Sequence, residues 1–432
     1  MTHESIEAQL AARRCAPEDV LRWIKPGMNV IVGAANGEPV QVIDAIEAGA
    51  ESLDGVRLHQ MIALRPRPYI EGQRPNLRHV SWFLSPHTRD AFHRGDCDLV
   101  PNSFSDVPRL MRQSLSPGLV TTAVSAPDRH GYFSLGPDAE YSAALIGEVP
   151  FFVEVNAQMP RTFGGNQLHF SDVVGFCEGD TPLIDVPTPP GGDRDRRIAE
   201  LVADRVPHGA TIQAGIGAVP TLVLSMLSGH RELGVHTELL GDGFVELVES
   251  GVITGTRKAT HRNKLVTTSA LGCGPLYDFV ADNPGVEFHP VEYTNDPRVI
   301  AREPHMTAIN ASLEVDFLGQ CASESLGSDY LSSSGGQPDY ARGAVMAEHG
   351  QAFIVLHSTT SDDSISRIVP QLHPGAAVTT FKNIVDKVVT EFGVAELRGS
   401  SIAERTRRLI AIAHPKFRDE LTAHAREFGY LT

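Results

Sequence analysis

One local pattern occurs in both halves of the sequence, and it constrains the fold more than any other feature. In the first half, residues 25–39 (Lys-Pro-Gly-Met-Asn-Val-Ile-Val-Gly-Ala-Ala-Asn-Gly-Glu-Pro) precede an apolar stretch that starts at Val40. In the second half, residues 206–220 precede a similar stretch that starts at Thr221. Each pattern is typical of a turn, a short strand, a glycine loop, a proline at a helix start and an apolar helix. It predicts two similar α/β domains related by internal duplication.

The rest of the chain alternates strand-like and helix-like segments. Short apolar runs at residues 151–155, 265–268 and 352–356 are typical of buried strands. Residues 195–206 and 401–413 carry apolar side chains at helical spacing. This alternation predicts an α/β fold with largely parallel sheets.

A polar segment near the middle of the chain predicts a domain boundary. Residues 185–197 (Asp-Val-Pro-Thr-Pro-Pro-Gly-Gly-Asp-Arg-Asp-Arg-Arg) combine proline, glycine and charge, which favours an exposed connector. We therefore expect an N-terminal domain over residues 1–187 and a C-terminal domain over residues 188–432. Either part is long enough to bury a core of its own.

Composition excludes several classes of protein. The formal net charge of −16 is unfavourable for binding nucleic acid or an anionic membrane. The sequence has no apolar run long enough for a transmembrane helix and no secretory signal at its start. None of the cysteines forms a C-x-x-C pair, so we expect no metal site, no disulfide framework and a cytoplasmic location. The five cysteines are Cys15, Cys97, Cys177, Cys273 and Cys321.

A glycine loop follows the predicted strand of the second half. Its candidate binding residues are consecutive: Gln213, Ala214, Gly215, Ile216 and Gly217. Glycines directly after a strand let a ligand approach the backbone, and the next helix offers N–H groups to an anion. The loop lacks the complete dinucleotide or P-loop motif. On this pattern alone, a tight turn without a ligand remains an alternative.

Glu238 lies in the run Gly234-Val-His-Thr-Glu-Leu-Leu-Gly-Asp-Gly243, beside apolar residues and just before a predicted turn into a helix. Burying a carboxylate is costly unless it is hydrogen-bonded or functional. A carboxylate can act as a nucleophile towards a thioester. An exposed loop glutamate is the alternative that the local pattern leaves open.

Two further loops carry groups that could bind a ligand. Gly335 and Gly336, in Leu331-Ser-Ser-Ser-Gly-Gly-Gln337, could present backbone N–H groups to an oxyanion, or could belong to a flexible loop. Asn156, Gln158 and Arg161 could hydrogen-bond a carboxylate or phosphate, but they could equally hold their own loop.

The histidines and serines do not form a known catalytic motif. His236 and His414 have no metal-site spacing, so we interpret both as structural. The absence of G-x-S-x-G gives no support to a serine hydrolase.

Taken together, these segments resemble the acetyl-CoA hydrolase/transferase family, in particular the 4-hydroxybutyrate CoA-transferases. The similarity extends over nearly the whole chain, at residues 125–136, 154–164, 213–220, 234–238, 293–297, 309–316, 366–370, 389–395 and 413–418. The resemblance implies two duplicated α/β domains and a homodimer. It also implies that Glu238 is the nucleophile, that residues 213–217 bind CoA, and that the loop with Gly335 and Gly336 lines the thioester site.

The sequence departs from the family pattern in two places. Ser333 occupies the first glycine position of the S-G-x-G-G-Q loop, where a positive φ would strain it. Lys382 replaces a common arginine, and Lys387 replaces a common tyrosine. Lysine cannot reproduce a bidentate arginine contact. These changes make the substrate contacts uncertain but leave the nucleophile in place.

The resemblance implies a CoA-transferase that exchanges CoA between an acyl-CoA and a small carboxylate such as acetate, butyrate or 4-hydroxybutyrate. Glu238 would form a glutamyl-CoA thioester, and coenzyme A would be a substrate rather than a prosthetic group. An acyl-CoA hydrolase, and a CoA-ester-binding protein without catalysis, are the alternatives.

Overall fold

The computed structural model describes residues 5–432, and their contacts divide the chain into two compact units. Unit 1 comprises Met1–Val186 and Val266–Thr294, and unit 2 comprises Pro187–Leu265 and Asn295–Thr432. The first boundary falls within the segment that the sequence indicates as a connector. The segment Val266–Thr294 groups with unit 1, whereas the division expected from the sequence counts it with the C-terminal domain.

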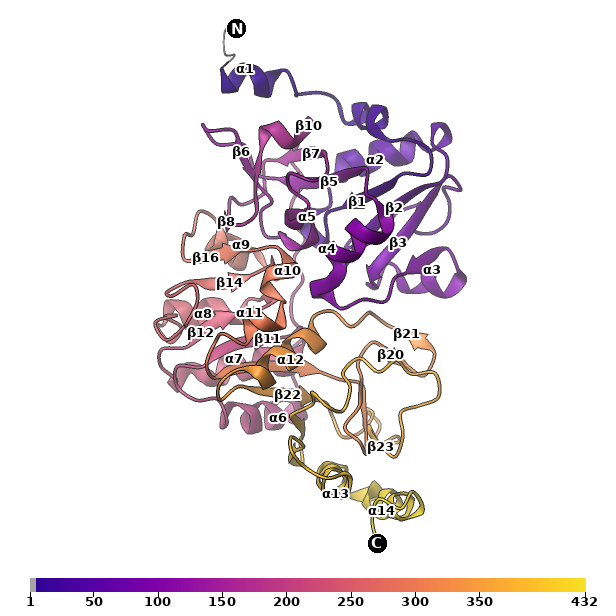
Figure 1. Ribbon diagram of the computed structural model, residues 1–432, viewed down its shortest axis with the longest axis vertical. Coiled ribbons are helices and arrows are strands. Elements are labelled where there is room, and N and C mark those ends of the chain that lie inside the picture. The colour runs from indigo at the N-terminus through magenta and orange to yellow at the C-terminus, as the bar shows by residue number, and fades with distance from the viewer. Residues whose placement is uncertain (1–4) are drawn as a thin grey trace. The chain divides into compact units, whose positions relative to one another are not determined.

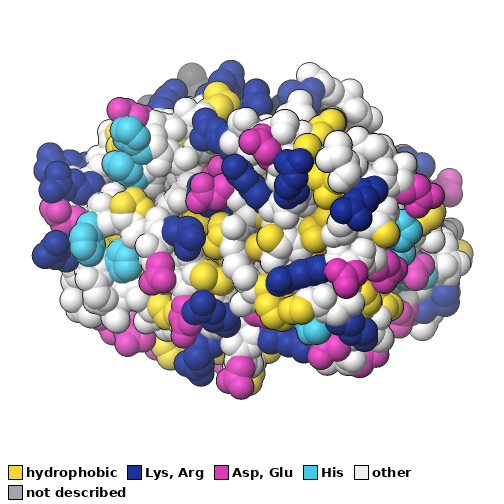
Figure 2. All heavy atoms as spheres, turned by 90° about the horizontal axis from the view of Figure 1, so that it is seen from below, with side chains coloured by type: hydrophobic (Ala, Val, Ile, Leu, Met, Phe, Trp, Pro, Cys, Tyr) yellow, Lys and Arg dark blue, Asp and Glu magenta, His cyan; other side chains and the backbone are white. Residues whose placement is uncertain are grey.

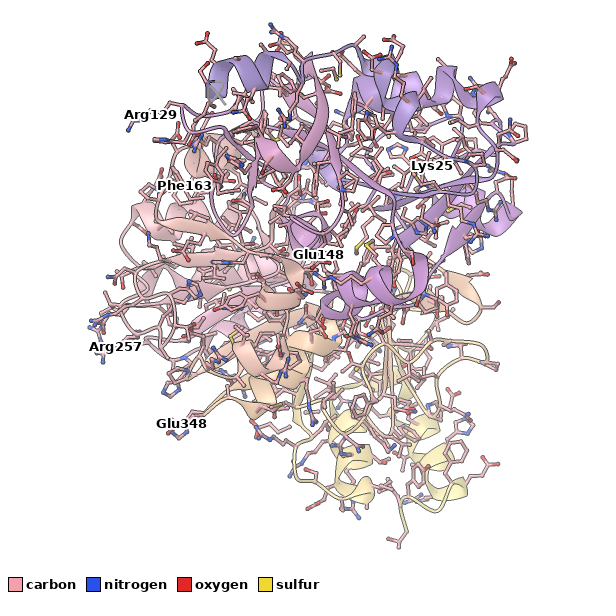
Figure 3. The ribbon with its side chains drawn as sticks, turned by 45° about the horizontal axis from the view of Figure 1, so that its top comes forward. Lys25, Arg129, Glu148, Phe163, Arg257 and Glu348 are labelled. Carbon is pink, nitrogen blue, oxygen red and sulfur yellow. The ribbon has the colours of Figure 1, made fainter. Side chains whose placement is uncertain are left out.

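Contacts within unit 1 explain why Val266–Thr294 groups there. Strand β16 (Val286–Phe288) pairs in parallel with β8 (Phe163–Gly164). The guanidinium of Arg112 donates to both carboxylate oxygens of Glu292, at 2.6 and 3.2 Å. Arg112 also donates to Glu148 at 2.7 Å, and Glu148 is labelled in Figure 3. An arginine that binds two carboxylates fixes the segment more firmly than a single exposed ion pair would.

Unit 1 is built on a parallel sheet whose strand order is β10-β7-β5-β1-β2-β3-β4 (Figure 1). Every residue of the inner strand β5 is buried, as is typical of a parallel sheet covered on both faces. The strands are β1 (Asn29–Val32), β2 (Val56–Met61), β3 (Leu77–Phe83), β4 (Cys97–Leu99), β5 (Leu119–Val124), β7 (Phe151–Asn156) and β10 (Val173–Gly179). A separate antiparallel pair joins β6 (Tyr132–Ser134) to β9 (Gln167–His169).

The helices of unit 1 are short. The predicted strand and helix of the first half are confirmed as β1 and α2 (Val40–Ala48), with a 3-10 turn, Ala35–Gly37, between them. The apolar side of α2 is buried through Val42, Ile43 and Ile46. The other helices are α1 (Ile6–Ala11), α3 (Arg89–Arg94), α4 (Val107–Leu110), α5 (Glu140–Ala144), α9 (Gly274–Val280) and α10 (Val291–Thr294).

A buried ion-pair network stabilises the connection between β1 and the helix that follows it. The side chain of Arg67 donates to Glu38 through Nε at 3.0 Å and through Nη2 at 2.7 Å, and both residues are almost fully buried. Arg67 also pairs with Asp44, which is on α2. Removal of one member leaves the opposite charge buried without a partner, which is more costly than losing an exposed pair.

Replacing Arg67 with methionine is expected to lower the free energy of unfolding of unit 1 by about 3–5 kcal/mol, because Glu38 would be left buried without its cation. Both tryptophans of the chain, Trp23 and Trp82, belong to unit 1, so their fluorescence during urea unfolding reports on this unit. Arg22→Met is the control, since Arg22 pairs with Asp19 at an exposed site and is expected to contribute less than about 1 kcal/mol. Equal effects of the two changes would contradict the prediction.

Unit 2 contains a second sheet, with the strand order β25-β24-β22-β17-β11-β12. Its pairings are parallel except for that of β24 with β25. The strands are β11 (Thr211–Ala214), β12 (Gly234–His236), β17 (Met306–Ala311), β22 (Gln351–Val355), β24 (Lys387–Thr390) and β25 (Gly393–Glu396). Shorter strands in this unit are β13 (Leu239–Leu240), β18 (Glu314–Asp316), β19 (Cys321–Ala322), β20 (Ser325–Leu326), β21 (Asp329–Tyr330) and β23 (Ile368–Val369).

The start of helix α13 in unit 2 is stabilised by hydrogen bonds between side chains and backbone. Helix α13 starts after Ser401, whose hydroxyl accepts from the N–H of Glu404 while the Glu404 side chain accepts from the N–H of Ser401. This reciprocal arrangement is a capping box, which satisfies otherwise unpaired helix-end groups. The helices are α6 (Asp193–Ala203), α7 (Ala218–Met226), α8 (Gly243–Glu249), α11 (Pro297–Ile300), α12 (Gln337–Met346), α13 (Ile402–Ile412) and α14 (Arg418–Glu427).

These elements confirm the predicted α/β fold with largely parallel sheets. The expected strands in residues 151–155, 265–268 and 352–356 correspond to β7, β14 (Leu265–Thr267) and β22. On the face displayed in Figure 2, basic and acidic side chains are interspersed. In the part of the chain that the structure describes, no helix combines the length and hydropathy that crossing a membrane requires.

Candidate active site

Glu238 lies in unit 2, in the short connection between β12 and β13. The residue remains partly exposed, but its carboxylate is set deep among protein atoms. Desolvation raises the pKa of Glu238 from 4.5 to about 7, because burial disfavours the charged form. Glu238 is therefore a desolvated carboxylate on a residue that keeps part of its surface exposed.

Two donors hold the Glu238 carboxylate. The side-chain amide of Asn295 donates to Oε2 at 2.5 Å, and the backbone N–H of Gly336 donates a second hydrogen bond. Both bonds favour the charged form and oppose part of the desolvation effect on the pKa. They also fix the direction of the carboxylate, which a positioned nucleophile requires.

Gly336 must be glycine for this arrangement to exist. A Cβ atom at position 336 would overlap the Oε2 of Glu238 and the Nδ2 of Asn295. Gly335, the preceding residue, has a φ of +54°, a left-handed conformation that glycine adopts without strain. The two glycines lead directly into α12, which begins at Gln337. The structure thus brings Gly336 to Glu238, and the oxyanion role expected of Gly335 and Gly336 stays a prediction.

Ser333 is not strained. Its φ is not positive, so the glycine that the family has at this position is not required for backbone conformation here. The Ser333 side chain is buried, and its hydroxyl forms no hydrogen bond within the described residues 5–432. The departure from the family pattern therefore does not disturb the loop.

The glycine loop proposed for CoA follows β11, the strand next to β12 in the sheet. Because β11 and β12 are parallel, the loop after β11 and the connection carrying Glu238 leave the same edge of the sheet. Gly217, with a φ of +130°, precedes the first turn of α7. Ile216 is 61% exposed, so this part of the loop is open to a ligand.

The first two residues of this candidate site have a different environment. Gln213 and Ala214 are buried in β11. The amide of Gln213 donates to Asn310 Oδ1 at 3.1 Å and accepts from Asn310 Nδ2 at 3.1 Å. Its oxygen also accepts from the N–H of Ile309 at 3.2 Å. The side chain of Gln213 thus connects β11 to β17, which leaves the backbone of residues 215–217 as the accessible part.

The two lysines that depart from the family pattern have ordinary surroundings. Lys387, on β24, pairs with Asp386 at 2.8 Å and lies over the ring of Phe353. Lys382 is exposed, and its backbone carbonyl accepts from Arg405 at 3.0 Å. The ion pair of Lys387 and the hydrogen bond to the carbonyl of Lys382 hold residues 382–387 in place.

The remaining candidate residues stabilise local structure. Asn156 accepts from the N–H groups of Gln158 and Thr181, and Arg161 pairs with Asp128 at 2.9 Å. Asn156 thus holds its own loop, which was one of the two alternatives, whereas Arg161 joins this loop to Asp128. The ring of His414 accepts from the N–H of Lys416 and caps the turn Pro415–Phe417.

Sequence reasoning missed a buried carboxyl pair in unit 1. Asp138 and Glu140 hydrogen-bond to each other, and the hydroxyl of Ser269 donates to Asp138 at 3.0 Å. Burial raises the pKa of both groups, that of Asp138 to about 7, because desolvation disfavours the charged form. The negative charge of Asp138 raises the pKa of Glu140 further, whereas the hydrogen bond from Ser269 lowers the pKa of both. Glu140 has a φ of +39°, an unusual conformation for this residue type. The pair ties the start of α5 to the glycine loop after β1 through the N–H groups of Ala34 and Gly37.

The fold and the site define a class of α/β proteins with largely parallel sheets, in which a desolvated carboxylate is held by an amide and a glycine. Residues 3–178 match the acetyl-CoA hydrolase/transferase N-terminal domain, and residues 272–425 match the C-terminal domain. The chain belongs to the acetyl-CoA hydrolase/transferase family. This confirms the family resemblance inferred from the sequence motifs.

Similar proteins and structures cover nearly the whole chain. It is 42% identical to the succinyl-CoA:cyclohexane-1-carboxylate CoA transferase of Geobacter metallireducens, with 98% of each chain covered. It is 40% identical to the 4-hydroxybutyrate coenzyme A transferase of Clostridium kluyveri over 94% of this chain and 95% of that protein. The crystal structure of RipA from Yersinia pestis has a TM-score of 0.93 at 33% identity and covers 99% of this chain and 100% of that chain.

Proposed function

We propose that this chain is a CoA-transferase that moves CoA from an acyl-CoA to a small carboxylate, with Glu238 as the nucleophile. The observation that carries the proposal is the Glu238 carboxylate itself, which is desolvated and is held by Asn295 and Gly336. A desolvated carboxylate is a stronger nucleophile than a hydrated one, and a thioester offers a good leaving group. The names of the relatives support the reaction class.

The first half-reaction has two steps. An oxygen of Glu238 attacks the thioester carbonyl carbon, and the carbon–sulfur bond then breaks. CoA leaves as a thiolate, and an acyl-glutamyl anhydride remains. The thiolate then attacks the glutamyl carbonyl carbon and releases the donor acid as its carboxylate, which leaves a glutamyl-CoA thioester. An acceptor carboxylate reverses the sequence and regenerates Glu238. Each half-reaction ends in release of one product, so ping-pong kinetics are expected.

The glycine loop beside Glu238 supplies the oxyanion donors in this proposal. The N–H of Gly336 bonds the Glu238 carboxylate before reaction. Once Glu238 is acylated it loses its negative charge, so this N–H and that of Gly335 become available to the oxygen of the tetrahedral intermediate. The backbone of residues 215–217 and the first turn of α7 would bind a CoA phosphate, since helix starts favour anions.

Candidate substrates are small acids of the acetate, butyrate and 4-hydroxybutyrate type. Incubation of the protein with acetyl-CoA and each acid separately tests the proposal by mass spectrometry of the CoA esters. Formation of a new CoA ester that requires the acid supports transfer. Release of free CoA without an acid supports the alternative of an acyl-CoA hydrolase. CoA-ester binding with neither outcome would assign the chain to the non-catalytic alternative.

The pH dependence of the reaction is expected to follow the ionisation of Glu238. Its raised pKa means that the nucleophilic carboxylate forms as the pH rises through about 7. We expect kcat/KM for acetyl-CoA to rise about tenfold per pH unit below this value and to level off above it. Asn295→Ala removes a bond that favours the charged form, so the midpoint should move to higher pH.

Asn283→Ala is the matched control for this pH profile. The amide of Asn283 also donates a hydrogen bond, but to the carbonyl of Phe279 at the end of α9. The control should keep the wild-type midpoint. A midpoint near the ordinary pKa of a glutamate in the wild-type protein, or an unshifted profile in Asn295→Ala, would contradict the assignment.

A further inference from the structure

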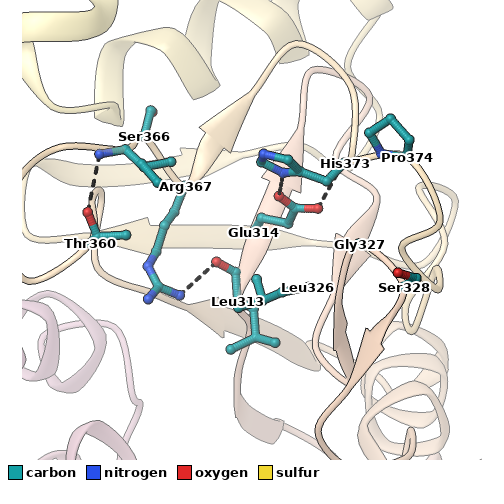
Figure 4. Close-up of a pocket in the computed structure, with 11 residues that line it drawn as sticks. Leu313, Glu314, Leu326, Gly327, Ser328, Thr360, Ser366, Arg367, His373 and Pro374 are labelled. Atoms are coloured by element: carbon teal, nitrogen blue, oxygen red, sulfur yellow. Dashed lines mark hydrogen bonds and ion pairs between the residues drawn. The ribbon is translucent and has the colours of Figure 1, made fainter. Parts of the chain in front are cut away.

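A pocket of about 390 Å³ lies in unit 2 and is lined by residues from two segments, 313–328 and 360–374 (Figure 4). Its size is within the usual range of small-molecule sites. Neither Asn295 nor Gly336, which hold the Glu238 carboxylate, lines it. Leu326, the last residue of β20, and the turn Gly327–Ser328 that leads to β21 form part of its wall. Two segments that resemble the family, 309–316 and 366–370, contribute to its lining, but the sequence assigns no ligand to the pocket.

The charge of Arg367 is not neutralised in this pocket. Arg367 donates from Nη1 to the carbonyl of Leu313 at 3.0 Å, as Figure 4 shows. Its Nε is buried and has no hydrogen-bond partner. Within residues 5–432 it forms no ion pair with a carboxylate. A partly buried guanidinium without a counter-ion favours binding of an anion.

The carboxylate of Glu314 in the same pocket already has partners within the protein. Glu314 is buried, and its Oε1 accepts from the backbone N–H of His373 at 3.0 Å. Its Oε2 contacts Nδ1 of His373 at 2.5 Å. Both oxygens therefore have partners within the protein. The group left to bind a ligand is the cation of Arg367, and the nearby Glu314 limits how much negative charge the pocket accepts.

The walls of the pocket provide hydrocarbon surface beside this cation. Leu313, Leu326, Ile365 and Pro374 contribute apolar side chains. Leu326 and Ile365 are 45% and 52% exposed, which is high for residues of this type. Burial of this surface by an apolar ligand would be favourable by about 25 cal/mol per Å².

We propose that this pocket binds a monocarboxylate with a hydrocarbon body, as a site separate from Glu238. The carboxylate would accept from the guanidinium of Arg367, and the hydrocarbon would pack on Leu326 and Ile365. A phosphate dianion would place a second negative charge near Glu314 without a second cation to balance it. The proposal concerns binding alone and does not depend on CoA transfer.

The hairpin that forms the pocket wall is connected to the loop that contains Gly335 and Gly336. After β21, the N–H groups of Leu331 and Ser332 both donate to the carbonyl of Glu324, at 2.8 and 3.2 Å. The hairpin that forms the pocket wall is thus joined to the segment that leads to Gly335 and Gly336. An occupant that packs against Leu326 would order this hairpin.

The test uses hexanoate and a six-carbon acid that carries an alkyl diazirine. The diazirine acid is photo-crosslinked to the whole protein without acyl-CoA, and the labelled peptides are mapped by mass spectrometry. Labels are expected in residues 313–328 or 360–374, and hexanoate should displace them. Hexan-1-ol and inorganic phosphate should each compete at least about tenfold less well than hexanoate. Hexan-1-ol has no negative charge for Arg367, and a phosphate dianion carries a second negative charge that no further cation balances.

Two variants and a matched control assign the binding to this pocket. Arg367→Met removes the cation and keeps a similar stem, so we expect labelling to fall at least about tenfold. Ile365→Asp adds a negative charge at an exposed lining position and should have the same effect without the loss of a hydrogen bond. Ile402→Asp is the control, because Ile402 is exposed to a similar extent, 50%, and does not line the pocket.

The outcomes decide the proposal in either direction. It is overturned if labelling is unchanged in Arg367→Met and Ile365→Asp, if phosphate competes as well as hexanoate, or if labels appear only in peptides that contain Glu238 or Gly336. If Arg367→Met does not fold, Ile365→Asp decides alone. Acyl exchange measured separately reports on Glu238, so failure of one proposal does not imply failure of the other.

Discussion

Replacing Glu238 with glutamine is expected to reduce acyl exchange by about four to six orders of magnitude, because the amide cannot attack a thioester. Glutamine has nearly the same size and can still accept hydrogen bonds from Asn295 and Gly336, so the site should keep its shape. The measurement is the initial rate of CoA transfer from acetyl-CoA to an acceptor acid. The wild-type protein should also form a hydroxylamine-sensitive adduct on the peptide that contains Glu238, and the variant should not.

Glu324→Gln is the matched control for this change. Glu324 is another buried glutamate of unit 2, its pKa is also raised by desolvation, and its side chain accepts from the hydroxyl of Thr379 at 3.1 Å. We expect this variant to exchange acyl groups at a rate within about tenfold of the wild type, since it removes no nucleophile. Exchange that survives in Glu238→Gln, or that is lost equally in both variants, would refute the assigned nucleophile.

Replacing Gly336 with alanine is expected to lower kcat for acyl exchange by about 100- to 1,000-fold while the protein stays folded. The added methyl group would overlap Oε2 of Glu238 and Nδ2 of Asn295. The carboxylate would have to rotate away from both donors, and the N–H of Gly336 would no longer face the reacting oxygen. Steady-state kinetics together with circular dichroism separate this effect from unfolding.

Gly229→Ala provides the comparison for Gly336→Ala. A Cβ at position 229 would have no neighbouring atom within 4 Å, and its backbone does not require glycine. This variant should retain the wild-type rate. A Gly336→Ala variant that is equally active would show that the contact between residue 336 and Glu238 is not needed for the reaction.

Local sequence patterns predicted much of the fold because they depend on neighbours in the chain. The apolar spacing of residues 40–48 and of residues 401–413 predicts helices close to the observed bounds. The grouping of Val266–Thr294 with unit 1 was not predictable in this way. It depends on the Arg112–Glu292 ion pair and the β8–β16 pairing, which join residues far apart in sequence.

The candidate site was predictable only in part for the same reason. Glu238, Gly335 and Gly336 were identified by resemblance, and the structure brings Gly336 to Glu238. Asn295 lies 57 residues from Glu238, and no spacing rule relates a single amide to a distant carboxylate. The raised pKa of Glu238 depends on how deeply the carboxylate is set, which the flanking residues alone do not determine. The assignment of residues 213–217 to CoA binding stays a prediction.

The paired amides of Gln213 and Asn310 have a consequence for how this protein diverges during evolution. Each amide satisfies the other, so a substitution at either position leaves a buried donor or acceptor unpaired at a cost of about 1–3 kcal/mol. Related sequences should therefore change the two positions together or keep both. Gln213, at the start of the glycine loop, would then be retained because it pairs with Asn310 in β17, independently of any ligand that the loop binds.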